Sequence, residues 1–159
     1  MTPACRVAAT LFFILLSSDA PALDAFGFST GQSPQQVEST AKNFNLGVAK
    51  WFGKSLIVQA QDSQEHSYLF NFCNERLYSI SQTFPAKFER LAGFVDQSIQ
   101  SYGQPMFISA AGGVGPSGFV RPINFYWRVG STDYLRVMQL ESSYTLIYET
   151  ENPCTKVPN

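Results

Sequence analysis

The chain contains little charge and almost no histidine. Charged residues make up 14% of its 159 residues, against roughly 25% in an average domain. The net charge is −1 and there is no basic run, so the electrostatic footprint of a protein that binds nucleic acid or an anionic membrane is absent. His66 is the only histidine, and a catalytic zinc normally takes three protein ligands. The sequence therefore predicts no nucleic-acid partner and no metal.

Two glycine-containing segments partly or fully match the sequence motifs of nucleotide-binding sites, but they lack the structural context that such sites need. Gly53-Lys54-Ser55 lacks the spacing of a phosphate-binding loop and lies between predicted strands. The segment from Gly113 to Gly118 satisfies G-x-G-x-x-G, but a strand interrupted by Pro122 follows it where a dinucleotide site needs a helix. We interpret the first as a hairpin turn and the second as an exposed loop, which could also move over a binding surface. We predict no cofactor.

Long apolar runs are also missing, apart from one near the start of the chain. Val7 to Leu16 is apolar and follows Arg6, but a transmembrane helix needs roughly 20 such residues. One basic residue, a short apolar run and then small residues is the layout of a secretory signal peptide. We expect cleavage after Ala22, possibly as late as Ala25, with an uncleaved anchor as the alternative. The mature chain would then be exported, periplasmic or extracellular, as one domain over residues 23–159 without an integral membrane segment.

Cysteine is scarce, and the predicted signal peptide removes one of the three cysteines. Cys73 and Cys154 are left, an even number in an oxidising compartment, so we expect them to form a disulfide. The closed loop of about 80 residues would be worth roughly 4 kcal/mol in the chain-entropy model. The alternative, a reactive thiol beside His66, is disfavoured because such a thiol is prone to oxidation outside the cytosol.

Apolar residues are plentiful, at 45% of the chain with 14% aromatic, which favours a folded core. Their spacing predicts two helices. The first begins with Ser33 as a cap, Pro34 at the first position and Gln36 completing a capping box; its apolar face is Val37, Ala41 and Phe44. The second opens at Pro85 and ends at Gly103; its apolar face is Phe88, Leu91, Val95, Ile99 and Tyr102.

Alternating apolar and polar residues predict about seven strands. These are residues 44–49, 55–61, 68–73, 77–81, 123–129, 135–137 and 144–148. The order is helix, four strands, helix, three strands. It predicts an α+β fold in which a mostly antiparallel sheet carries both helices on one face.

Two local segments resemble those of small exported envelope domains. They are the helix entry from Gly31 to Val37 and the helix end from Tyr102 to Pro105. Similar turns occur in β-barrel assembly accessory lipoproteins and in β-lactamase-inhibitor-like domains, which are also modules of helices and an antiparallel sheet. The lipid-bearing cysteine of the accessory lipoproteins is missing from this sequence, and the resemblance assigns no site residues.

The last three predicted strands carry a candidate binding surface. A sheet covered by helices on one face meets water or a partner on the other, and aromatic and arginine side chains are enriched at interfaces. The residues of this kind are Tyr126, Arg128, Tyr134, Arg136 and Tyr144. The alternative is an ordinary amphipathic sheet surface. We therefore expect a small exported binding module without catalytic residues, whose partner would be another exported or envelope protein; its oligomeric state stays open.

The main alternative function is a hydrolase of cell-wall or polysaccharide material. Glycosidase chemistry needs only two suitably spaced carboxylates. The acids near predicted strand ends are Asp62, Glu65, Glu75, Asp133, Glu141, Glu149 and Glu151. No local pattern selects two of them, because acids at strand ends also keep turns solvated.

Overall fold

The computed structural model describes residues 23–60, 66–110, 112–115, 118–120, 122–140, 142–151 and 154. The predicted signal peptide lies outside these residues. Within them, the helices are α1 (Pro34–Asn43) and α2 (Phe88–Tyr102). The strands are β1 (Asp24–Ala25), β2 (Phe28–Ser29), β3 (Val48–Phe52), β4 (Ser55–Gln59), β5 (Ser67–Cys73), β6 (Arg76–Pro85), β7 (Phe107–Ser109), β8 (Gly113–Gly115), β9 (Gly118–Val120), β10 (Ile123–Arg128), β11 (Asp133–Gln139) and β12 (Ser143–Thr150).

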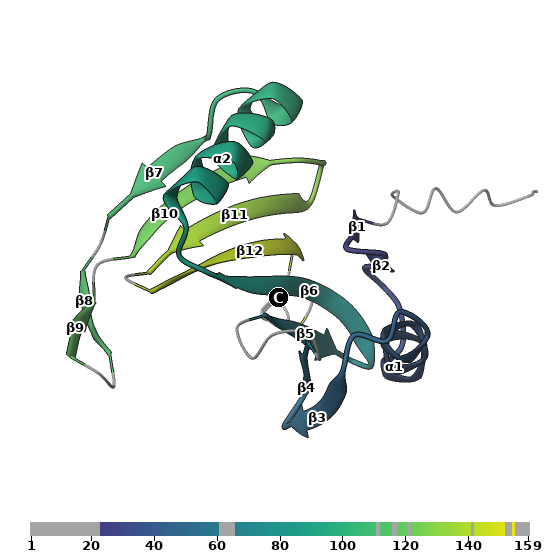
Figure 1. The fold of residues 1–159 in the computed structure, drawn as a ribbon. Helices are drawn as coiled ribbons and strands as arrows, with labels where there is room; N and C mark the ends of the chain where they lie inside the picture. The colour runs from purple at the N-terminus through teal and green to yellow at the C-terminus, as the bar shows by residue number, and fades with distance from the viewer. Residues whose placement is uncertain are drawn as a thin grey trace, which may run out of the picture.

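Eight of these strands form one sheet in the order β3-β4-β5-β6-β12-β11-β10-β7, and every neighbouring pair is antiparallel. The pairs β1-β2 and β8-β9 form separate small sheets. Both helices lie on one side of the large sheet (Figure 1). The predicted α+β fold is confirmed, with one strand more in the main sheet than the pattern indicated.

The order of the elements repeats along the chain. In the first half α1 precedes the meander β3 to β6, and in the second α2 precedes β7, β10, β11 and β12. The last strands of the two halves, β6 and β12, are antiparallel neighbours at the centre of the sheet. The second half also contains the hairpin β8-β9, which extends away from the large sheet (Figure 1). Where we expected a loop, residues 113–115 and 118–120 thus form paired strands.

Helix α1 begins as its sequence predicts. The Ser33 hydroxyl accepts a hydrogen bond from the Gln36 backbone N–H at 3.3 Å, and the Gln36 side chain accepts one from the Ser33 N–H at 2.8 Å. This reciprocal pair satisfies two backbone donors that the first turn of a helix leaves free. Val37 and Ala41 are buried, whereas Phe44, the third expected apolar position, is 54% exposed at the end of the helix.

Helix α2 begins three residues later than expected. Pro85 is the last residue of β6 and lies opposite Ser143, so the chain is still extended there. Lys87 is the N-cap and provides no side-chain capping bond. Phe88 consequently lies at the first helical position, 77% exposed, and is not part of the buried face. The predicted end is confirmed, since Gly103 has a φ of +80° and its N–H donates to the Ile99 carbonyl at 2.8 Å.

The core lies between the helices and one face of the large sheet. The α1 side contains Phe28, Val37, Leu56, Val58, Phe70 and Ile80, each fully or almost fully buried. The α2 side contains Leu91, Trp127, Leu135, Val137 and Leu146, with Phe94, Val95 and Ile99 packed against them. Alternate residues of each strand therefore meet the helices, and the residues between them form the opposite face. We call that opposite face the helix-free face.

Replacing Ser33 tests whether its capping hydrogen bond stabilises α1. We expect Ser33→Ala to lower the free energy of unfolding by about 0.5–2 kcal/mol, because the Gln36 N–H loses its acceptor. Ser39→Ala is the matched control, since Ser39 is exposed in the middle of the same helix and has no capping role. Urea denaturation of both variants measures the difference. An equal effect of the two substitutions would contradict a capping role for Ser33.

The predicted disulfide is present. Cys73, at the end of β5, is bonded to Cys154, and their Cα atoms lie 5.9 Å apart. Cys73 is 1% exposed, whereas Cys154 is exposed. The bond attaches the segment after β12 to the first half of the sheet. Neither helix in the described part of the chain is long and apolar enough to cross a membrane.

Candidate functional site: the helix-free face at β7, β10 and β11

The register of the sheet aligns one row of side chains across the helix-free face. From β3 to β7 the row is Lys50, Ile57, Leu69, Ser81, Ile147, Arg136, Tyr126 and Phe107. Its middle is buried, with Ser81 6% and Ile147 7% exposed. Its two ends are accessible, since Phe107 is 49% exposed and Lys50 is also exposed. The end formed by β7, β10 and β11 combines aromatic and cationic groups.

Four of the five residues expected on the binding surface meet at this end. Tyr126 is directly opposite Arg136, and Arg128 is directly opposite Tyr134, on the adjacent strands β10 and β11. Arg128 is exposed, and the other three are half-buried. Because partners in an antiparallel pair point to the same side, the four side chains share the helix-free face.

Tyr144 does not belong to this group, so the prediction was wrong for this residue. It is 1% exposed in the core under α2, where its ring stacks on Phe84 at 5.1 Å and packs against Phe94 at 5.8 Å. Burial raises the pKa of the Tyr144 phenol, and the positive charge of Arg90 opposes the rise. Strand periodicity predicts this burial, because Tyr144 is two positions before the core residue Leu146 and therefore points to the same side of the sheet.

Three side chains stack across the edge of the sheet. The ring of Phe107 stacks on Tyr126 with centroids 4.2 Å apart and an interplanar angle of 20°. The guanidinium carbon of Arg136 lies 5.7 Å from the Tyr126 centroid, and Nη1 donates to the Tyr126 hydroxyl at 3.4 Å. A cation over an aromatic ring gains about 0.5–1 kcal/mol at exposed sites and more when desolvated. The stack holds Arg136 in one place on a rigid strand.

The two arginines of this group differ in what they bind. Arg128 donates from Nε to the Gly130 carbonyl at 3.1 Å and from Nη2 to the Ser131 carbonyl, so its guanidinium closes the β10–β11 turn. Arg136 donates only to Tyr126 within the described residues, and its buried Nε has no hydrogen-bond partner. A guanidinium has five N–H donors. Arg136 therefore retains donors for a ligand, whereas Arg128 is engaged in the turn.

Phe107 is the site residue that the sequence analysis missed. Its strand, β7, is only three residues long and follows the proline that ends the α2 segment. Such a short segment shows no alternation from which a strand can be predicted. The available signal was the apolar run Met106-Phe107-Ile108, whose members are about half exposed in the structure.

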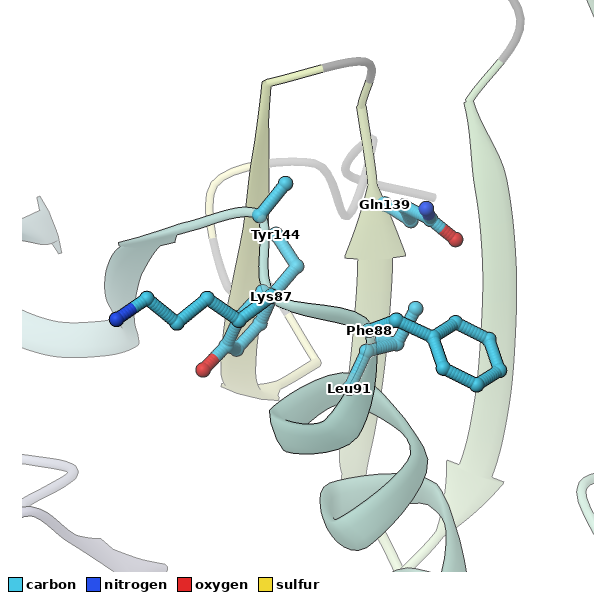
Figure 2. A pocket seen from close by; sticks show the side chains of 6 residues that line it. Lys87, Phe88, Leu91, Gln139 and Tyr144 are labelled. Atoms are coloured by element: carbon cyan, nitrogen blue, oxygen red, sulfur yellow. The ribbon is translucent and has the colours of Figure 1, made fainter.

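Three cavities in the described part of the chain do not combine catalytic groups. One of about 220 Å³ lies between the start of α2, the end of β11 and the start of β12, and its lining includes Lys87, Phe88, Leu91, Gln139 and Tyr144 (Figure 2). One of about 280 Å³ lies on the helix-free face at β3 and β4. The third, of about 460 Å³, lies between α1 and β3 and has Glu38 as its single carboxylate.

The carboxylates considered for hydrolysis are dispersed. Asp62, Glu65 and Glu141 lie outside the described residues. Of the others, Glu75 is exposed in the β5–β6 turn, Asp133 begins β11, Glu149 is on the helix-free face, and Glu151 follows β12. The described part of the chain contains no group of three or more side chains suited to hold a metal.

His66 and Gly53 both have structural roles, His66 in side-chain packing and Gly53 in a turn. The His66 ring packs edge-on against Phe84 with centroids 5.3 Å apart. Gly53, with a φ of +61°, forms the turn between β3 and β4, as the sequence predicted.

No protein-family model, curated protein or solved structure matches this chain.

Proposed function

We propose that this protein is an exported, non-catalytic binding module that binds another exported or envelope protein through its helix-free face. The contact residues are Phe107, Tyr126, Tyr134 and Arg136, at the end formed by β7, β10 and β11. The observation that carries the proposal is the stack of Phe107, Tyr126 and Arg136, in which the guanidinium has one hydrogen bond to the described residues and further N–H donors.

The residue types and their placement support a contact surface. Tyrosine and arginine dominate the binding energy of protein interfaces, since they combine large contact areas with directional hydrogen bonds. Here these side chains lie on paired strands and are already stacked on each other, so little side-chain entropy remains to be lost on binding. Phe107 provides exposed apolar area beside them.

Export is supported by two independent features. The first 25 residues have the layout of a signal peptide. The Cys73–Cys154 disulfide belongs to the type of bond that persists in oxidising compartments and is rare in the cytosol. In this proposal the protein meets its partner in the periplasm or outside the cell.

Capture of the partner from exported proteins of the native host tests the surface. We expect Tyr126→Ala to reduce recovery of the partner about tenfold, equivalent to about 1.4 kcal/mol, because the stack loses its central ring. Tyr102→Ala is the matched control, since Tyr102 is 43% exposed at the end of α2. Quantitative mass spectrometry of the captured proteins measures recovery.

Two outcomes would contradict the proposal. One is equal recovery of the same proteins with Tyr126→Ala, Tyr102→Ala and the unaltered chain. The other is turnover of cell-wall or polysaccharide substrates that is lost when a single carboxylate is replaced, which would favour the hydrolase.

A further inference from the structure

Arg136 is a cation without a counter-ion in the part of the chain that the structure describes. It is half-buried, its Nε is shielded from solvent without a hydrogen-bond partner, and its one hydrogen bond goes to a neutral hydroxyl. Burying a charged group costs free energy unless the group is paired. Neither its cross-strand partner Tyr126 nor its partner Ile147 carries a charge. Arg136 is therefore positioned to receive an anionic group from outside the chain.

The charge of the helix-free face points to the same kind of ligand. The charged strand residues of this face near the stack are two cations, Arg128 and Arg136, and one carboxylate, Glu149, which lies opposite Tyr134; Lys50 lies at the other end of the row. The complete chain, by contrast, has a net charge of −1. Charge complementarity steers association and selects partners. A partner that docks here would present acidic groups.

The neutral polar groups of the face indicate a polypeptide in preference to a polysaccharide. Several are already bonded within the protein: Thr83 to Thr145 at 3.1 Å, Ser55 to Asn71 at 2.7 Å, Asn124 to Ser109 at 3.5 Å, and Ser81 to the Leu69 carbonyl at 3.4 Å. They offer few free groups to sugar hydroxyls. The exposed side chain that the edge strand β7 places beside Tyr126 and Arg136 on this face is instead apolar, namely Phe107.

From these observations we infer that the partner inserts an aspartate or glutamate side chain against Arg136, within a segment that also places an apolar side chain against Phe107. This inference rests on the proposed function and specifies the chemistry of the partner. The carboxylate accepts hydrogen bonds from the guanidinium, an arrangement that is stronger than a neutral hydrogen bond. Tyr126 keeps the guanidinium in place for the incoming group.

A synthetic peptide tests the inference on the intact, disulfide-bonded protein. The probe is a capped octapeptide of alternating glutamate and leucine, and its neutral match replaces each glutamate by glutamine. We expect the acidic peptide to bind at least about tenfold more tightly, and raising the salt to about 0.5 M to reduce this difference. Arg136→Met should abolish the preference for the acidic peptide. Arg136→Lys should retain part of the preference, because lysine keeps the positive charge but lacks the planar, bidentate donor geometry of the guanidinium. Arg90→Met, in exposed α2, is the matched control and should leave binding unchanged.

The outcomes separate this inference from the proposed function. Binding of the acidic peptide that is the same in Arg136→Met and the unaltered chain, with near-ultraviolet circular dichroism showing both folded, would overturn the inference. Binding of polygalacturonate through Arg136 without binding of the peptide would overturn it in favour of an acidic polysaccharide. A third outcome is that Tyr126→Ala abolishes capture of the native partner, whereas Arg136→Met and added salt leave it unchanged. This result would support the binding module and overturn the inference of an acidic segment. Capture that is insensitive to both substitutions would overturn both proposals.

Discussion

Trp127→Ala is expected to lower the free energy of unfolding by about 3–5 kcal/mol. Trp127 is 1% exposed and lies in the core beneath α2 with Leu135, Val137 and Leu146. Its indole N–H also donates to the Gly103 carbonyl at 2.9 Å, so it connects β10 to the end of α2. The substitution removes the largest buried side chain, leaves a cavity and frees this carbonyl.

Trp51→Ala is the control for this prediction, since the sequence contains two tryptophans and Trp51 is 46% exposed on the edge strand β3. We expect a much smaller loss for Trp51→Ala. Trp127→Phe separates the two contributions, because it keeps most of the apolar volume and removes only the indole donor. Circular dichroism during guanidinium denaturation is the suitable readout, since each alanine variant loses one tryptophan fluorophore. Equal losses at the two tryptophans would contradict the assigned core.

Removing the disulfide is expected to have an effect of similar size. Replacing both cysteines, Cys73→Ala with Cys154→Ala, should lower the free energy of unfolding by about 2–5 kcal/mol. The bond joins residues 81 positions apart, and without it the unfolded chain gains the conformational freedom of a large loop. The double variant avoids leaving one unpaired thiol in the core at Cys73.

Reduction provides the control for the disulfide. Dithiothreitol should destabilise the unaltered protein to the level of the double variant and leave the double variant unaffected. Free thiols at both Cys73 and Cys154 in the unreduced protein, detected by titration under denaturing conditions, would contradict the bond. So would unchanged stability in the double variant.

Short-range signals were sufficient for several elements. Ser33, Pro34 and Gln36 are adjacent in sequence and form the cap of α1 by themselves. Asn74 and Glu75 form the expected reversal between β5 and β6, both with positive φ, of 48° and 57°. Alternation located β4, because Leu56 and Val58 on one side of this strand are buried whereas Ile57 and Gln59 on the other side are exposed.

Elements with weaker local signals were misplaced. Pro85 fits the first turn of a helix and equally the end of a strand, and its pairing with Ser143 of β12 decides between the two. The three-residue strands β7, β8 and β9 are too short to show a period. Tyr144 was assigned by its chemical type to the surface, whereas its position relative to Leu146 places it in the core.

The sequence by itself determined the α+β class, the cap of α1, the end of α2, most strands of the sheet and the pairing of Cys73 with Cys154. These features depend on neighbouring residues, on periodicity or, for the cysteines, on the prediction that Cys5 leaves with a signal peptide. Only the tertiary structure decided that β6 lies beside β12, that the order of elements repeats in two halves, and that Phe107 and Arg136 stack on Tyr126. The physical reason is that strand order and register are set by packing between segments distant in sequence, which no local pattern encodes.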